Sequence, residues 1–371
     1  MECRAFDEQV VRHDPQVGDL MDQFVCVRLV AANALDLTLF QFDYDLTFAV
    51  FFLNADRTVY GRFGSRSDQK HAEKDISIEG FRQALARALE LHKGYPANKA
   101  ALAGKQPRTP RFKSPDDYPS LHGRYKANLD YEGKVVASCV HCHQVREAER
   151  VFFRADRQPI PDEVLYPWPM PDAIGLALDP QEKAMVREVA RDSVAMKAGF
   201  KTGDEIATLD GQPMLSIADV QWALHHAPQP ATLRAQVLRA GKKKNLTLTL
   251  PAVWRRQTDI SWRATTWDLR RMATGGLVLK EASAAERTQA QLAENDLALL
   301  VDYVGQYNEH AAGKRAGFQK GDVIVSVDGQ SRRMSEGQFI GYLVQTKQLG
   351  DKVPLTVLRA GQRVNLELPM Q

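Results

Sequence analysis

Residues 197–212 are KAGFKTGDEIATLDGQ, and residues 315–330 are RAGFQKGDVIVSVDGQ. A second match follows in each copy, where VLRAG at 237–241 recurs at 357–361. The two offsets are 118 and 120 residues, which indicates one duplicated domain and not a short-period solenoid. Gly-Asp and Asp-Gly pairs supply turn geometry that bulkier residues cannot adopt. Each copy is therefore predicted to contain strands, a short helix ending in Ala-Gly, an amphipathic helix and a C-terminal hairpin.

This pattern resembles the PDZ domain of the bacterial type found in Deg-type periplasmic proteases. The resemblance covers residues 172–252 (the first copy) and 275–371 (the second copy), with 253–274 as a linker. It implies two partly open β-barrels with two helices each. The whole chain is then expected to combine an α/β part with these mainly-β modules.

The resemblance also implies peptide binding, because PDZ domains take a partner's C-terminal or extended segment as an added strand. A loop of successive amide N–H groups would capture the terminal carboxylate. The predicted peptide-binding residues are Gly175, Leu176, Ala177, Leu178, Val220 and Leu224 in the first copy, and Gly276, Leu277, Val278, Leu279, Phe339 and Leu343 in the second. The first four residues of each set form the loop, and its third residue is Ala177 or Val278 where the family often has glycine. The last two residues of each set lie on a helix, and their alternative role is that of ordinary core residues.

Residues 139–143 (CVHCH) have the Cys-x-x-Cys-His spacing by which c-type haem is attached. Cys139 and Cys142 would each add to one vinyl group of the porphyrin, and His143 would ligate the iron. Met170 is the first candidate for a sixth ligand and His122 the second. The predicted cofactor is covalent haem c, held by the segment 106–171. A redox dithiol without haem and a metal site remain alternatives.

Residues 1–105 resemble a thioredoxin-like domain. The stretch 48–64 predicts a hairpin and 77–92 an amphipathic helix. A strand is expected around Phe24 to Leu29, with Cys26 buried in it. Asp45-Leu46-Thr47 departs from the family, which usually has a cis-proline there.

By the same resemblance Cys3 would be the catalytic resolving thiol, and its partner would precede Met1; an ordinary N-terminal cysteine is the alternative. We therefore expect an N-terminally truncated chain whose export signal lies upstream.

The chain has 371 residues, a net charge of +3 and four cysteines, which fits several globular domains and argues against nucleic-acid binding. No apolar run reaches the length of a membrane span, and no Gly-x-Ser-x-Gly protease motif occurs. The sequence thus predicts a periplasmic or otherwise extracytoplasmic redox and electron-transfer protein that recruits partners through its PDZ domains. The redox partner is not identified. The alternatives are a non-enzymatic peptide-binding scaffold and a haem-free thiol-disulfide oxidoreductase.

Overall fold

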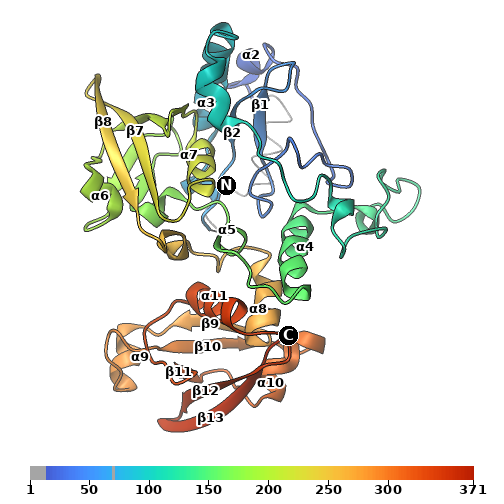
Figure 1. The fold of residues 1–371 in the computed structure, drawn as a ribbon, viewed down its shortest axis with the longest axis vertical. Helices are drawn as coiled ribbons and strands as arrows, with labels where there is room; N and C mark the ends of the chain where they lie inside the picture. The colour runs from blue at the N-terminus through green and yellow to red at the C-terminus, as the bar shows by residue number, and fades with distance from the viewer. Residues whose placement is uncertain (1–13, 69–71) are drawn as a thin grey trace. The chain divides into compact units, whose positions relative to one another are not determined.

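The computed structural model describes residues 14–68 and 72–371, and these divide into two compact units (Figure 1). Unit 1 runs to Ala148 and resumes over Tyr166–Asp259. Unit 2 comprises Glu149–Leu165 and Ile260–Gln371. The chain therefore crosses between the units three times, and each PDZ-like copy lies in a different unit.

The N-terminal part of unit 1 is a hairpin covered by one long helix. Strands β1 (Val50–Leu53) and β2 (Val59–Phe63) pair antiparallel. Helix α3 (Ile78–Lys93) begins at Ser77, whose hydroxyl accepts a hydrogen bond from the Gly80 N–H at 2.9 Å. Its buried residues recur at helical spacing, so that one face packs on the hairpin. The predicted hairpin and helix are thus both formed.

The strand expected at residues 24–29 does not form. Val25 and Val27 are 95% and 79% exposed, and Cys26 is exposed where a core position was predicted. Alternating apolar residues form a strand only where they pair with a neighbouring strand. The sheet of this part contains β1 and β2 alone, so residues 24–29 do not pair with it. The described residues therefore do not support the thioredoxin-like fold.

The rest of this part is built from short turns around a second small core. That core joins residues near Leu35 with Tyr118, Leu121 and Val145. The short elements are α2 (Gly18–Met21), η1 (Ala72–Lys74), η2 (Lys99–Lys105), η3 (Pro115–Asp117) and η4 (Val136–Ser138).

Helix α4 (Cys142–Ala155) carries the chain from unit 1 into unit 2. The segment after the crossing packs within unit 2. The buried Arg150 guanidinium donates to the Thr265 carbonyl at 3.1 Å. The Gln345 amide donates to the Ile160 carbonyl at 3.0 Å. Helix α5 (Asp162–Leu165) completes the segment.

The first copy places two sheets and helix α7 around one core. β3 pairs with β4, and the second sheet has the order β6-β5-β7-β8. Their side chains form one buried cluster with α7 and Trp254. The elements are η5 (Pro171–Ile174), β3 (Leu176–Leu178), β4 (Val186–Val189), α6 (Val194–Ala198), β5 (Glu205–Leu209), β6 (Gln212–Pro213), α7 (Ile217–His225), β7 (Ala231–Arg239), β8 (Lys242–Leu250) and η6 (Trp254–Gln257).

The second copy forms one sheet of order β13-β12-β11-β10-β9. Helix α8 precedes this sheet and packs on α11. The elements are α8 (Thr266–Thr274), β9 (Leu277–Glu281), α9 (Ala284–Gln289), β10 (Leu299–Val304), η7 (Asn308–Ala311), α10 (Ala312–Arg315), β11 (Val323–Val327), α11 (Glu336–Thr346), β12 (Lys352–Arg359) and β13 (Gln362–Pro369).

The repeated letters of the two copies form one repeated clamp. In the first copy the Arg239 guanidinium donates to both oxygens of the buried Asp204 at 2.7 and 2.8 Å, and to the Gly199 carbonyl at 2.8 Å. Gly199 ends α6 with φ +91°, a conformation that favours glycine. The carboxylate also accepts the Lys201 N–H at 2.9 Å. The clamp therefore ties a helix end, a turn and a strand together.

The same clamp recurs in the second copy. Arg359 donates to both oxygens of Asp322 at 2.7 Å and to the Gly317 carbonyl at 2.8 Å. The turn is closed by the Gln319 N–H, which donates to Asp322 at 2.9 Å. The Ala-Gly, Gly-Asp and Val-Leu-Arg matches of the sequence are therefore the parts of one structural device.

Candidate peptide-binding sites

Strand β3 is the edge of its sheet in the first copy, because β4 pairs with only one side of it. Leu176 and Leu178 point into the core, while Ala177 between them is half-buried. Gly175 precedes the strand with φ +86°, and a Cβ there would lie 2.2 Å from the Ser193 Cβ. Only glycine therefore fits the start of this predicted carboxylate loop.

Helix α7 is the expected second wall of this site. Val220 and Leu224 are fully buried and belong to the same cluster as Leu176 and Leu178. They are therefore core residues in this structure, which was the alternative interpretation. A role in lining a pocket for a peptide side chain stays a prediction.

The other side of α7 is fixed to the N-terminal hairpin. Lys105 Nζ lies 2.7 Å from Asp219 Oδ2, and both side chains are 0% exposed. Asp219 also accepts the Arg62 N–H at 3.2 Å and the Leu215 N–H at 3.0 Å. Burial lowers the pKa of Lys105 to about 8, although the Asp219 carboxylate acts in the opposite direction. Sequence reasoning missed this ion pair.

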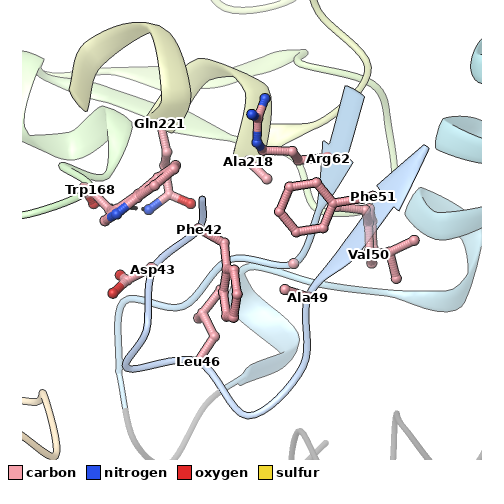
Figure 2. Close-up of a pocket in the computed structure, with 12 residues that line it drawn as sticks. Phe42, Asp43, Leu46, Ala49, Val50, Phe51, Arg62, Trp168, Ala218 and Gln221 are labelled. Carbon is pink, nitrogen blue, oxygen red and sulfur yellow. Dashed lines mark hydrogen bonds between the residues drawn. The ribbon is translucent and has the colours of Figure 1, made fainter. Parts of the chain in front are cut away.

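A small pocket adjoins the same helix (Figure 2). Figure 2 shows the rings of Phe42 and Phe51 on one side of it, with Trp168 and Gln221 on the other. The Gln221 amide donates to the Trp168 carbonyl at 3.0 Å. Arg62 lines the pocket, but its guanidinium donates to the carbonyls of Gln41 and Lys105 at 3.2 and 3.1 Å. The Arg62 guanidinium and the Gln221 amide are thus engaged within the fold, so we assign no ligand to the pocket.

The second copy has the same edge arrangement, with β9 as the terminal strand of its sheet. Gly276 has φ +86°, and a Cβ there would lie 2.0 Å from the His310 carbonyl oxygen. Leu277 and Leu279 are buried, and Val278 is half-buried. Phe339 and Leu343 of α11 are fully buried, as are their counterparts in α7.

The two helices differ at their first residue. Ser216 caps α7 and Ser335 caps α11, so Ile217 and Glu336 occupy equivalent positions. Glu336 accepts the Leu279 N–H at 2.8 Å and forms an ion pair with Arg270 of α8 at 2.6 Å. Ile217 has no group that could do either.

The Cys-x-x-Cys-His segment lies at the start of α4. Cys139 and Cys142 are free thiols, and burial raises the pKa of both. Burial lowers the pKa of His143, whose ring stacks on His141 with centroids 5.5 Å apart. Neutral thiols and a neutral imidazole are therefore the favoured forms.

The structure does not bring the two candidate sixth ligands to this segment. Met170 packs on the core of the first copy, whereas Cys142 packs on the separate cluster around Val145. His122 Nδ1 lies 3.1 Å from the Asp116 carbonyl oxygen on the surface. Within residues 14–68 and 72–371, no group of three or more His, Cys, Asp and Glu side chains is placed to hold a metal ion. Cys3 lies outside the described residues.

No helix in the described part of the chain is both long and apolar enough to cross a lipid bilayer.

Comparison with known proteins gives matches to both copies. The family model for the PDZ domain matches residues 172–250 and 291–370. A probable periplasmic serine endoprotease DegP-like of Marinomonas sp. is 27% identical over 190 residues, which cover 51% of this chain and 37% of the relative. Escherichia coli K12 DegP is 28% identical over 159 residues, covering 43% and 29%. The chain thus spans well under half the length of these relatives.

The comparison also gives a further relative, DegQ, and a solved structure, that of AlgW. The periplasmic pH-dependent serine endoprotease DegQ of Escherichia coli K12 is 28% identical over 151 residues, which cover 41% of this chain and 29% of DegQ. Among solved structures, the HtrA-type protease AlgW with decapeptide is 18% identical, with a TM-score of 0.23 over 38% of this chain and 52% of AlgW.

These relatives overturn the redox prediction. They are named as serine endoproteases, so the expected electron-transfer function, the oxidoreductase-like activity and the covalent haem c are wrong. The non-enzymatic scaffold is wrong for the same reason, and the absence of a Gly-x-Ser-x-Gly motif does not separate this chain from serine endoproteases. The packing of Met170 agrees with this correction, since the proposed sixth ligand is partly buried against the core of the first copy.

The prediction of two PDZ domains, in contrast, is confirmed by the family match, which covers residues 172–250 and 291–370. Each copy of the duplicated domain therefore contains a PDZ domain, and the copies, with the bounds predicted from the repeat, are called PDZ1 and PDZ2 below.

Proposed function

We propose that this chain binds C-terminal or extended segments of other proteins through its PDZ domains and presents them for serine endoprotease activity outside the cytoplasmic membrane. The observation that carries the proposal is the pair of edge strands, β3 and β9. Each is preceded by a glycine, at which a Cβ would clash with a neighbouring residue. An edge strand offers unpaired backbone groups to an added strand. The periplasmic location and the proteolytic setting rest on the names of the relatives.

Peptide binding is tested with fluorescein-labelled decapeptides that end in Val, Leu or Phe. Fluorescence anisotropy on the full chain should show saturable binding. Amidated versions of the same peptides should bind more weakly, because the loop would lose its charged partner. Equal binding of the free and amidated peptides would exclude carboxylate capture and leave only extended-strand binding.

Gly175→Ala should weaken binding to PDZ1, because the new Cβ would clash with Ser193. Gly211→Ala is the matched control. Gly211 also has a positive φ, at +75°, but a Cβ there meets nothing within 4 Å. The backbone strain is then similar in both variants, and only the first alters the loop.

The proteolytic part is tested with β-casein as an unfolded substrate. Degradation by the purified chain, blocked by diisopropyl fluorophosphate, would place the activity in this chain. Faster degradation by a separate DegP-like protease on addition of the chain would place the activity in a partner. If the chain neither degrades casein nor alters its degradation, the proteolytic part fails while peptide binding stands.

A further inference from the structure

The outer edge of β9 in PDZ2 already has an occupant. The N–H of Leu279, in the loop expected to receive a peptide, donates to Glu336 Oε1 at 2.8 Å. Glu336 is the first residue of α11, so its carboxylate joins the strand to the helix across the expected peptide site. A peptide that adds to β9 must take this N–H from Glu336.

Arg270 of α8 holds the carboxylate in this position. Its Nε donates to Oε1 at 2.9 Å and its terminal nitrogen to Oε2 at 2.6 Å. The Arg270 and Glu336 side chains are 11% and 5% exposed, so water screens the pair little. Two parallel N–H···O bonds also fix the geometry of the pair.

The backbone of Arg270 occupies the other end of the same loop. Its carbonyl accepts the Gly276 N–H at 3.0 Å and the Thr274 hydroxyl at 2.9 Å. One residue of α8 therefore controls the N–H of Gly276 directly and that of Leu279 through Glu336. Helix α8 and the loop form a single closed arrangement.

PDZ1 lacks the central part of this arrangement. Ile217 replaces Glu336, and it packs into the core of the domain. The residue equivalent to Leu279 is Leu178, and an isoleucine cannot compete for its N–H.

We propose that Glu336, held by Arg270, is a built-in competitor that keeps PDZ2 closed to peptides until α8 is displaced, whereas PDZ1 has no such competitor. This inference rests on the proposed peptide binding. A partner must supply a better acceptor for the Leu279 N–H than Glu336. The binding affinities of the two domains for one peptide are therefore expected to differ, with PDZ2 the weaker.

The test uses the double variant Arg270→Leu/Glu336→Ile in the full chain. It copies the apolar residue of PDZ1 and removes both charges together, because removing one would leave the other buried without its partner. Amide hydrogen exchange needs no ligand. Exchange at Leu279 should become at least about ten-fold faster than in the unaltered chain, since its acceptor is gone. Exchange at Leu178 should not change.

The second measurement adds the Val-ending decapeptide and follows hydrogen exchange over β3 and β9. In the unaltered chain, protection by the peptide should appear at β3 alone. In the double variant it should extend to β9, with an affinity gain of about 5- to 150-fold there, the usual range of coupling between two sites.

Arg271→Leu is the matched control, because Arg271 lies on the same helix but pairs with Asp268 and Glu309. It should alter neither measurement. Unchanged exchange at Leu279 in the folded double variant would overturn the proposal, as would peptide protection of β9 in the unaltered chain. Faster exchange at Leu279 in the double variant, without protection by peptide at either strand, would instead refute the proposed peptide binding. It would still show that Glu336 holds the Leu279 N–H in the unaltered chain.

Discussion

PDZ1 and PDZ2 share a fold, yet the equivalent helices α7 and α11 make different contacts in the two domains. Every residue of α7 from Ile217 to Leu224 is buried, whereas α11 keeps Gln338, Tyr342 and Gln345 partly exposed. The cause lies within unit 1, where β2 and η2 pack on α7. A duplicated domain has thus become a support for the N-terminal hairpin in one copy, while the other copy controls its own edge strand through Glu336.

The largest effect is expected from Asp219→Ala. The substitution leaves the Lys105 ammonium buried without its partner, which should cost unit 1 about 3–5 kcal/mol. The equivalent residue of PDZ2 is Gln338, whose side chain accepts the Ser335 N–H at 3.1 Å in a capping box. Gln338→Ala should cost unit 2 about 0.5–1.5 kcal/mol, the usual contribution of one hydrogen bond. Urea unfolding followed by hydrogen exchange resolves the two units, and equal losses would contradict the comparison.

The repeated clamp should behave alike in both domains. Arg239→Ala and Arg359→Ala each remove a two-pronged partner from a buried aspartate, and each should destabilise its own unit by about 1.5–3 kcal/mol. Thermal unfolding of the two single variants and the double variant measures this. The two sites lie in different units, so the losses should not interact. A clear difference between the two would show that the copies have diverged in their shared framework as well.

The smallest effect concerns pH. Burial raises the pKa of Asp204, but hydrogen bonds from Arg239 and the Lys201 N–H outweigh it and bring the pKa below its ordinary 3.8. The unfolded chain therefore binds the proton first as the pH falls. The stabilisation by this carboxylate is present above pH 3.8 and is lost as the pH falls below it. The melting temperature of unit 1 should fall less steeply below pH 4 in Arg239→Ala than in the unaltered chain.

The repeat predicted the PDZ domains because its letters are the clamp itself. Gly199 and Asp204 recur with the same separation as Gly317 and Asp322, and the arginine follows the aspartate by 35 residues in the first copy and 37 in the second, so the sequence contains the contact twice. The ion pairs of Lys105 with Asp219 and of Arg270 with Glu336 were missed, because each joins residues far apart in the chain without repeating. The capping serine before each helix was the available sequence signal for the difference between the two helices. Aligning the two helices on it places Ile217 opposite Glu336.

The thioredoxin and haem predictions failed for a different reason. A hairpin and a helix are local patterns that many folds share, and they did form. The strand at residues 24–29 needed a distant pairing edge, which no local pattern supplies. Likewise, five residues around Cys139 say nothing about the surroundings of Met170, which packs into PDZ1.

The three crossings of the chain between the units have a consequence for any attempt to excise PDZ2. A cut between Asp259 and Ile260 severs the last crossing but leaves Glu149–Leu165 on the N-terminal fragment. That segment supplies Arg154, which donates to the Lys347 carbonyl at 2.5 Å, and Asp162, which accepts from Gln345 at 2.6 Å. The two fragments should therefore copurify after cleavage, and residues 260–371 expressed alone should fold only when the N-terminal fragment is supplied in trans.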